Sequence, residues 1–360
     1  MKRIGYIYEQ IVSIENCKMA ILNASDGKRD RYTVRIVLDD IDTYAKELSE
    51  RLKALDFTTP YIIRIVKDGL SKKERELMIP AFYPDQCAHH AIVQVIMPII
   101  LKSSYYWSCA NIQQRGIDRA CRGVERATIK DVKHAKYCVK LDVKKFYPSI
   151  PHDRLKERFR QKIKDEKALQ IIFHVIDTAE GVPIGNYTSP WFAELYLQPL
   201  DHYIKEQLHV KHYIRYADDM VIIGNNKRHL MRVLHSVKDF VESLGLTLKG
   251  NYQLFRILGR QNGRKIDFVG RCFARGYTTI RKRRALAFMR QSRRIQKLQN
   301  RNIPVPFRVA AGFLSRSNCL IHTKSLGLKK KYYDTVDIEN LKEVIRHESQ
   351  RKRCSPAFGY

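Results

Sequence analysis

The sequence predicts a fold that mixes helices with short β-hairpins, and two acid-bearing strands carry this prediction. From Tyr213 to Gly224, apolar and strand-prone residues flank the adjacent pair Asp218-Asp219, which is the pattern of a hairpin with two acids at its tip. A second strand-like run, Tyr137–Val143, has Asp142 near its end. Amphipathic segments with helical spacing fill much of the remaining chain.

The charge balance narrows the class of partner. The 360 residues include 67 Lys and Arg against 37 Asp and Glu, so the net charge is +30. Such an excess favours a polyanion, above all nucleic acid. No apolar run is long enough to span a membrane, and Met1–Tyr6 has no secretory pattern, so we expect no membrane partner. Eight cysteines without a C-x-x-C motif are expected to be free thiols in a reducing compartment.

The first 80 residues predict helices followed by a hairpin. Helical signals run through residues 1–58 and include an amphipathic stretch from Asp39 to Leu55. Tyr61–Val66 and Glu74–Pro80 are expected to pair as strands across a charged turn. A basic hairpin of this kind can lie over a triphosphate, although a solvated loop is the simpler explanation of its composition.

The middle of the chain alternates helices with turns. Gly181–Pro190 has two glycines and two prolines, which allow a close approach of the backbone to a ligand. Short strands are expected at Gly245–Gly250 and at Lys265–Phe273, the latter paired with Tyr277–Ile280. Helices are expected at Ala88–Leu101, with an interruption near Pro98, and at Pro151–Lys164, Ala168–Thr178, Trp191–Gln207 and Lys227–Leu244.

The composition changes at Arg281, where we expect a domain boundary near residue 280 and a mainly helical tail. The charge in this region has one sign and cannot neutralise itself, which favours contacts with phosphates. The cations are Arg281, Lys282, Arg283, Arg284, Arg290, Arg293, Arg294, Lys297 and Arg301.

The acids at the two strand ends suggest metal-dependent chemistry. Adjacent carboxylates repel each other unless a cation lies between them, and hard oxygen ligands suit magnesium. If the pair Asp218-Asp219 is considered without Asp142, a solvated turn is enough to explain it. If Asp142 meets this pair, however, the two strands could hold two metals about 4 Å apart for in-line phosphoryl transfer.

These motifs together resemble those of reverse transcriptases of the prokaryotic retroelement type. The resemblance covers roughly residues 60–280 and continues more weakly into the basic tail. Tyr216-Ala217-Asp218-Asp219 resembles the Y-x-D-D hairpin of that family, and Leu141–Tyr147 resembles its first palm motif. The other matching segments are Ile184–Pro190 before the palm helix, Leu246–Asn251, the primer-grip hairpin at Ile266–Phe273, and Arg115-Gly116 before the palm.

The resemblance implies an α+β right-hand polymerase with fingers, palm and thumb. It implies an N-terminal helical segment at 1–58, fingers at 59–136, a palm with an antiparallel sheet at 137–280, and a basic helical thumb at 281–360. It further implies an RNA-directed DNA polymerase, a nucleotidyltransferase, that is cytoplasmic in a bacterium or encoded by a phage. The implied partners are template RNA, dNTPs and the cDNA product.

The resemblance also assigns residues. Asp142, Asp218 and Asp219 would be catalytic and, with Val143, would hold two Mg²⁺ ions, for which Mn²⁺ is a possible substitute. Lys249 is a candidate for protonating pyrophosphate, with a surface lysine as the alternative. Nucleotide-binding positions would be Lys73, Arg75, Lys144, Lys145, Phe146, Tyr147, Ile184 and Gly185. Nucleic-acid-binding positions would be Arg115, Tyr216, Gly270, Arg281, Lys282, Arg283, Arg284, Arg290, Arg293 and Arg294.

Tyr147 carries a prediction about the sugar. It lies five residues after Asp142, where reverse transcriptases place an aromatic ring under the nucleotide sugar. A flat ring at that place leaves no room for a 2′-hydroxyl, whereas RNA polymerases with the same palm generally have an acid there. The resemblance therefore implies deoxynucleotide substrates.

Departures from the family patterns bear on the biological role. Because the chain ends at Tyr360 without a maturase-like or endonuclease-like extension, a group II intron protein is not expected. Ile184-Gly185 resembles diversity-generating retroelements, but Ser189-Pro190 and Asp85-Gln86 depart from the usual Ser-Gln and Asp-Arg. The combination resembles stand-alone reverse transcriptases of bacterial antiviral defence, which copy an associated non-coding RNA.

Three alternatives stay open. One is a diversity-generating enzyme with error-prone cDNA synthesis, and another is a catalytically idle RNA-binding scaffold. The third concerns partners, since an accessory protein, a second polymerase or self-association would each be compatible with the sequence. The template and the mode of priming are not determined by these motifs.

Overall fold

The computed structural model describes residues 3–67, 74–259, 262–318 and 326–354. Lys73 lies outside these ranges, so its expected role in nucleotide binding is not addressed by the structure. The chain begins with four helices, α1 (Tyr8–Val12), α2 (Ile14–Ala24), α3 (Tyr32–Asp39) and α4 (Ile41–Ala54). The helix expected over Asp39–Leu55 is present as α4. It begins two residues later than expected, because the backbone of Asp40 lies outside the helical region (φ −131°, ψ 53°) and separates α4 from α3.

The hairpin expected next is present. Strands β1 (Ile62–Lys67) and β2 (Glu74–Ile79) pair antiparallel, with Arg75 opposite Val66. A π-helical turn, η1 (Phe82–Gln86), then leads into α5 (Cys87–Leu101), which packs against α2. The expected interruption of α5 near Pro98 is wrong. Because proline removes a single backbone hydrogen bond and the flanking Ile96, Ile99 and Ile100 are buried, the last turn stays helical.

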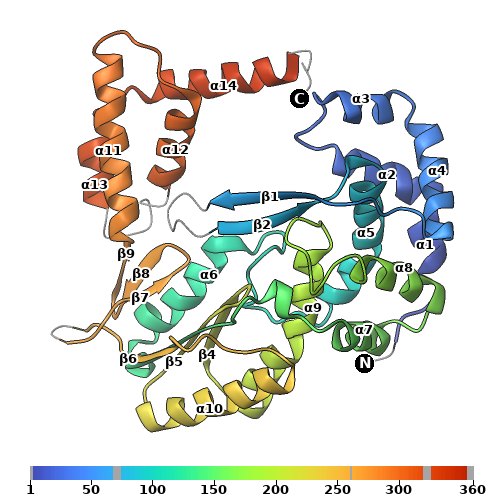
Figure 1. Ribbon diagram of the computed structural model, residues 1–360. Coiled ribbons are helices and arrows are strands. Elements are labelled where there is room, and N and C mark those ends of the chain that lie inside the picture. Colours follow the sequence, from blue (N-terminus) through green and yellow to red (C-terminus); the bar gives the residue numbers. More distant parts are fainter. Residues whose placement is uncertain (1–2, 68–73, 260–261, 319–325, 355–360) are drawn as a thin grey trace.

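A four-stranded antiparallel sheet lies at the centre of the chain, in the order β4-β5-β3-β6 (Figure 1). The strands are β3 (Tyr137–Asp142), β4 (His212–Tyr216), β5 (Asp219–Gly224) and β6 (Gln253–Arg256). The helices nearby are α6 (Gly116–Glu125), α7 (His152–Lys162), α8 (Glu166–Ile176), α9 (Ser189–His202) and α10 (Lys227–Ser243). Short helical turns lie between them at η2 (Arg126–Lys130), η3 (Val132–His134), η4 (Tyr147–Ser149) and η5 (Tyr203–Gln207).

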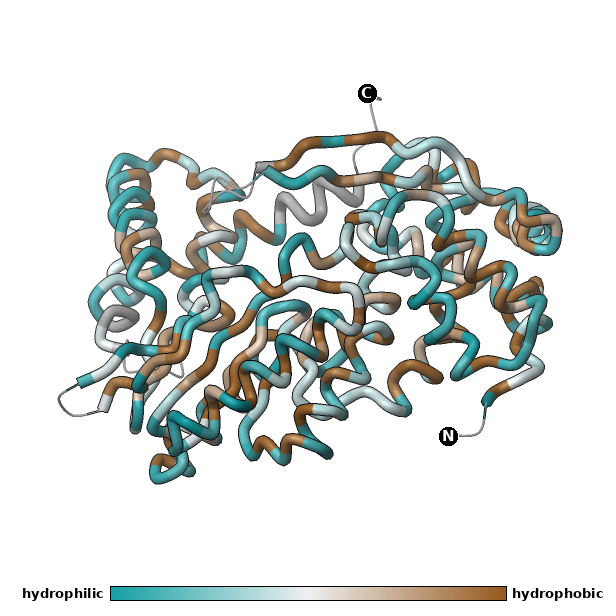
Figure 2. Tube along the Cα trace, turned by 60° about the horizontal axis from the view of Figure 1, so that its bottom comes forward, coloured by the Kyte–Doolittle hydropathy of each residue, from teal (hydrophilic) through white to brown (hydrophobic). Residues whose placement is uncertain are grey.

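The central sheet is covered on both faces. On one face, Val139, Leu141 and Ile222 join the core that α9 and α10 share with the N-terminal helices. On the other face, Cys138 and Val221 join a second core with α6. Alternate residues of a strand point to opposite faces, so a strand buried on both sides becomes a continuous apolar run. Residues 220–223 of β5 form such a run, and all four are buried. The tube in Figure 2 shows hydrophobic stretches inside the molecule beside hydrophilic ones.

Two strand predictions between residues 245 and 273 are wrong. Gly245–Gly250 forms only an isolated bridge between Leu248 and Val143. The stretch Lys265–Phe273 is divided into β7 (Ile266–Phe268) and β8 (Arg271–Ala274), which form a meander with β9 (Tyr277–Ile280). The division falls at Val269 and Gly270, whose φ angles are 42° and 83°, because a reversal of the chain there needs left-handed backbone.

The C-terminal region is helical, as expected. It consists of α11 (Lys282–Gln299), α12 (Phe307–Asn318), α13 (Leu326–Tyr333) and α14 (Ile338–Cys354). Phe288, Ile295, Phe313 and Leu341 form a core here that is separate from the other two. Figure 1 shows α11 rising from the end of the β7–β9 meander, away from the central sheet. No helix in the described part of the chain is long and apolar enough to cross a membrane.

Candidate active site

The acids of the two predicted strands meet at one end of the central sheet. Tyr216 pairs with Asp219 across the turn Ala217-Asp218, and β5 pairs with β3 so that Asp219 lies opposite Asp142. Ala217 takes a left-handed backbone conformation (φ 54°), which closes the turn within two residues. The hairpin and β3 thus bring Asp142, Asp218 and Asp219 to one place.

The environment of Asp218 and Asp219 opposes the ionisation of these two carboxylates. Burial is the main reason that the pKa of Asp218 rises to about 6, and the neighbouring charge of Asp142 adds to the rise. Burial also raises the pKa of Asp219 to about 6, although Lys140 opposes that rise. A bound cation would reverse this balance, because an opposite charge favours the ionised form.

Two lysines already contact the acids. Lys249 donates a hydrogen bond from its ammonium to Asp142, and its backbone N–H donates to the Asp142 carbonyl over 2.8 Å. Lys140 Nζ lies 3.6 Å from Asp219 Oδ2 and donates to the carbonyl of Asp267 over 2.7 Å. Our sequence reasoning missed Lys140. Its position two residues before Asp142 could have indicated it, because such residues share one face of a strand.

The oxygen atoms at this site fit a divalent cation in their chemistry. One oxygen of Asp142 and one of Asp219 are buried and have no hydrogen-bond partner among the described residues. Buried polar atoms without partners are costly, and carboxylate oxygens are preferred ligands of Mg²⁺. In their present conformations, no three His, Cys, Asp or Glu side chains of the described ranges are gathered into a preformed metal cluster.

Tyr147 lies beside the acids in the turn η4 that follows β3. Its side chain is half-buried and hydrogen-bonds to that of Asn111. Burial, with the nearby charge of Asp218, raises the pKa of Tyr147 to about 12, so the hydroxyl keeps its proton at neutral pH. A cavity of about 10 Å³ lies against Tyr147, Asn111 and Ala217. Phe146 also lines this cavity and is buried.

The turn-rich loop links this region to the β1–β2 hairpin. Val182 donates a backbone hydrogen bond to the Tyr147 carbonyl over 2.9 Å, and Met78 of β2 donates to the Ile184 carbonyl over 2.8 Å. Gly185 has φ 136°, and a Cβ there would lie 2.2 Å from the Met78 carbonyl oxygen. Glycine is therefore required at this position by both the backbone angle and the close approach of β2. Three expected nucleotide-binding cations, Arg75, Lys144 and Lys145, are exposed.

Two expected nucleic-acid contacts have internal partners. Arg115 donates from Nη1 to the carbonyls of Tyr105 (2.7 Å) and Ser108 (3.2 Å), so its guanidinium holds the loop before α6. Tyr216 is half-buried and packs against the second core. Arg115 and Tyr216 thus contribute to the scaffold in this structure.

A buried ion-pair network was also missed by sequence reasoning. Arg215 is 1% exposed, and its guanidinium contacts Asp201 Oδ2 at 2.5 Å and Glu194 Oε2 at 2.9 Å. The two acids lie seven residues apart on α9, hence on one face of the helix. An arginine within an apolar strand was the available signal, since a buried charge requires partners.

The basic helix α11 presents cations on the side away from its core. Phe288, Ser292 and Ile295 are buried, whereas the exposed cations are Lys282, Arg283, Arg290, Arg293, Arg294 and Lys297. Arg281 forms an ion pair with Asp267 (2.6 Å), so its charge is partly neutralised. At Gly270 an added Cβ would lie 2.2 Å from the guanidinium carbon of Arg284, which places that arginine against the β7–β8 turn.

Comparisons with known proteins agree with this geometry. Residues 84–251 match the family described as reverse transcriptase (RNA-dependent DNA polymerase). Retron Ec73 reverse transcriptase of Escherichia coli is 30% identical over 142 residues, which are 36% of this chain and 45% of that protein. Group II intron-encoded protein LtrA of Lactococcus lactis is 29% identical over 147 residues, 37% of this chain and 23% of that protein. The chain thus spans less than half the length of either relative.

Solved structures support the fold. The structure of apo telomerase from Candida tropicalis aligns with a TM-score of 0.50 at 15% identity, over 88% of this chain and 64% of that chain. At this identity the likeness concerns the fold alone. Together with the mixed helices and sheet, it confirms the expected α+β right-hand polymerase fold.

Proposed function

We propose that this chain, whose residues 84–251 form a reverse transcriptase domain, is an RNA-directed DNA polymerase. The observation that carries the proposal is the meeting of Asp142, Asp218 and Asp219 at one end of the central sheet. The buried oxygen atoms of Asp142 and Asp219 that lack hydrogen-bond partners among the described residues support a role for these acids as metal ligands.

The three aspartates, with the backbone carbonyl of Val143, would hold two Mg²⁺ ions. When bound, such ions activate the primer 3′-hydroxyl and neutralise charge on the triphosphate and the departing pyrophosphate. The raised pKa values of Asp218 and Asp219 are consistent with carboxylates whose ionised form a bound cation would stabilise. Lys249, whose ammonium donates a hydrogen bond to Asp142, would supply a proton to the leaving group.

The nucleotide would lie between Tyr147 and the β1–β2 hairpin. The backbone of Ile184 and Gly185 joins these two elements, and Lys144 and Lys145 add exposed charge at the same end of β3. The Tyr147 ring would select deoxynucleotides by excluding a 2′-hydroxyl. The template and primer would follow the basic face of α11, in the proposed thumb at 281–360.

For the biological role we propose a stand-alone reverse transcriptase of antiviral defence that copies an associated non-coding RNA. The name of one relative, a retron reverse transcriptase, supports a prokaryotic retroelement setting. Ser189-Pro190 in place of the usual Ser-Gln disfavours the diversity-generating alternative, whereas Ile184-Gly185 favours it. Purifying the protein from cells and sequencing its RNA and cDNA separates the two, because a diversity-generating enzyme would concentrate substitutions at template adenines.

The polymerase itself is tested by Asp218→Asn. Primer extension on an RNA template with dNTPs and Mg²⁺ should be abolished, while the affinity for RNA stays within about twofold, because the change removes one charge from a site that nucleic acid does not need for binding. Asp239→Asn on the exposed face of α10 is the matched control and should extend normally. No extension by the wild type beside a working control polymerase would instead favour an idle RNA-binding scaffold. Undiminished extension by Asp218→Asn would exclude Asp218 as a catalytic residue.

A further inference from the structure

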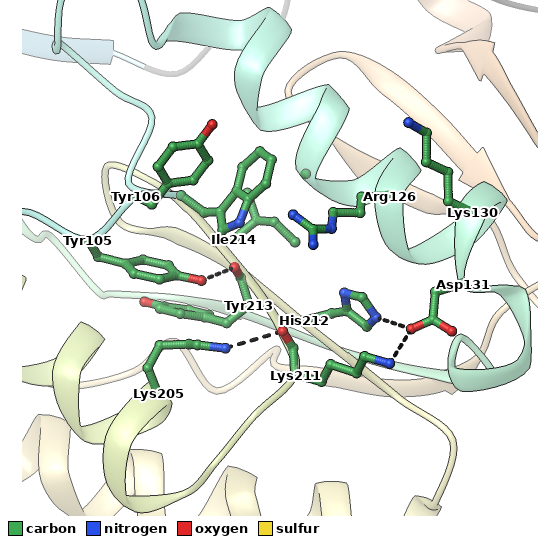
Figure 3. Close-up of a pocket in the computed structure, with 12 residues that line it drawn as sticks. Tyr105, Tyr106, Arg126, Lys130, Asp131, Lys205, Lys211, His212, Tyr213 and Ile214 are labelled. Carbon is green, nitrogen blue, oxygen red and sulfur yellow. Dashed lines mark hydrogen bonds and ion pairs between the residues drawn. The ribbon is translucent and has the colours of Figure 1, made fainter.

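A second cavity lies at the far end of β4 from the catalytic turn. Its volume is about 540 Å³, within the range of ligand sites. Its lining comes from the loop at residues 105–107, from α6 with η2, and from η5 with β4 (Figure 3). Tyr213 in its wall precedes Asp218 by five residues, or roughly 16 Å of strand, so the cavity is separate from the polymerase site.

Cations dominate the charge of this cavity. Arg126, Lys130, Lys205 and Lys211 line it, and Asp131 is its single carboxylate. Asp131 already accepts hydrogen bonds from Lys211 (2.7 Å) and His212 (2.8 Å), so it cannot neutralise the others. Arg126 and Lys130 are exposed, and within the described ranges their side chains have no hydrogen bond or ion pair. Figure 3 shows Arg126 reaching toward the centre, between the aromatic residues and Asp131.

Aromatic rings form the opposite wall. Tyr105 stacks on Tyr213 with ring centroids 5.4 Å apart and donates a hydrogen bond to the Tyr213 carbonyl, which fixes both rings. Tyr106 is 57% exposed at the rim and meets the half-buried Trp107 edge to face. The guanidinium of Arg119 lies over one face of the Tyr106 ring, 3.8 Å from its centroid, so a base would stack on the other face. Trp107 rests on Gly123 of α6, where an added Cβ would lie 2.9 Å from the indole ring. Glycine weakens a helix, but at this position the lack of a side chain leaves room for the indole ring of Trp107.

We propose that this cavity binds a segment of single-stranded RNA outside the polymerase cleft. Arg126 and Lys130 would contact phosphates, and Tyr106 with Trp107 would stack on a base. Paired cations and exposed aromatic rings are the combination with which proteins bind single strands, because every base has a flat face and every nucleotide a phosphate. The net charge of +30 points to the same class of partner. The inference goes beyond the polymerase activity and does not require it.

The test uses the full chain and a short single-stranded RNA that contains 4-thiouridine. Ultraviolet cross-linking followed by peptide mapping should place the RNA on the peptide that contains Tyr106 and Trp107. The double variant Arg126→Ala/Lys130→Ala should lose about tenfold in RNA affinity, with a salt slope lower by about 1.4. Arg122→Ala/Lys133→Ala is the matched control, since both residues are exposed cations of α6 and η3 outside the cavity, and should change affinity by less than about twofold.

Two further variants sharpen the result. Tyr106→Ala should weaken RNA binding by about tenfold through lost stacking, with no change in the salt slope. Asp218→Asn should keep the cross-link, which separates this site from a failure of polymerase activity. Equal losses in the two double variants, or cross-links confined to other peptides, would overturn the proposal. If adenosine monophosphate blocks the cross-link and both double variants keep equal RNA affinity, the cavity binds a free nucleotide. That result would also overturn the proposal.

Discussion

Arg215 donates a hydrogen bond from Nη1 to the carbonyl oxygen of Ala217 over 3.1 Å. A fully buried cation therefore holds the residue that immediately precedes Asp218. The same guanidinium contacts Asp201 and Glu194 on α9, and Glu194 also accepts hydrogen bonds from Ser104 and Ser108 (2.7 Å each). The position of the Ala217-Asp218 turn thus depends on a network that extends to α9 and to the loop that contains Ser104 and Ser108.

This network predicts the behaviour of Arg215→Lys. Lysine keeps the charge but lacks the planar fork, so it cannot contact both acids and the Ala217 carbonyl at once. We expect the kcat of primer extension to fall about tenfold, because misplacing a catalytic group by a fraction of an ångström is costly. We also expect the free energy of unfolding to fall by about 1–3 kcal/mol through the lost hydrogen bonds.

Enzyme kinetics and thermal unfolding measure these effects. The KM for dNTP should stay within about twofold, since Arg215 is buried away from substrate. Arg228→Lys, on the exposed surface of α10, is the control and should change neither quantity. Wild-type kcat in a folded Arg215→Lys variant would show that the turn is positioned by its backbone alone.

Substitution of Tyr147 tests the choice of sugar. Tyr147→Ala removes the ring that lies beside the acids and should raise ribonucleotide incorporation relative to deoxynucleotide by at least about tenfold. Tyr147→Phe keeps the ring and loses only the hydroxyl that bonds to Asn111, so its discrimination should match the wild type. Single-nucleotide extension with dATP and ATP gives the ratio. Unchanged discrimination in Tyr147→Ala would rule out the ring as the gate.

The exposed cations of α11 are expected to contact phosphates. Replacing Arg290, Arg293 and Arg294 by Gln should weaken RNA–DNA duplex binding and lower the slope of log affinity against log salt by about 2 or more. The matched control replaces Lys227, Arg228 and Arg232 of α10, which are likewise exposed on one helix. Fluorescence polarisation across a salt series measures both slopes. If the two triple variants lose the same slope, the α11 cations act only through net charge.

His89 predicts a loss of stability in acid. Burial lowers its pKa from 6.5 to about 3, and its Nδ1 has no hydrogen-bond partner among the described residues. Below pH 6.5, His89 binds a proton in the unfolded chain, whereas in the folded chain it stays neutral until the pH approaches 3. The free energy of unfolding therefore falls as the pH drops from 6.5 toward 3, by up to about 1.4 kcal/mol per pH unit from this residue.

The variant His89→Leu removes this penalty. Its Tm should fall less than that of the wild type between pH 7 and pH 5, as measured by thermal unfolding at each pH. His90, whose pKa burial lowers to about 4, contributes a similar loss that both proteins share. His235→Leu at an exposed position of α10 should follow the wild-type curve. A parallel fall in Tm for His89→Leu and the wild type would contradict the prediction.

The order of side chains along the chain was enough to predict the strand at Asp142 and the hairpin at Asp218-Asp219. Both follow from apolar runs and turns, which are local properties. The helices of residues 151–244 were predictable for the same reason. Local patterns failed at Pro98, where the helix continues because its neighbours are buried, and at Val269-Gly270, where the chain reverses and divides the expected strand.

The candidate site shows the same division between local and long-range information. The acids and the one-signed charge of α11 could be read from the sequence, because residue type and spacing define them. The contact of Lys249 with Asp142 joins residues 107 positions apart, and the contact of Arg215 with Asp201 crosses from β4 to α9. Such contacts depend on sheet register and on how helices pack over the sheet, so three-dimensional packing was needed to reveal them. The cavity beside Arg126 and Tyr106 likewise exists because three separate segments of the chain meet at the edge of β4.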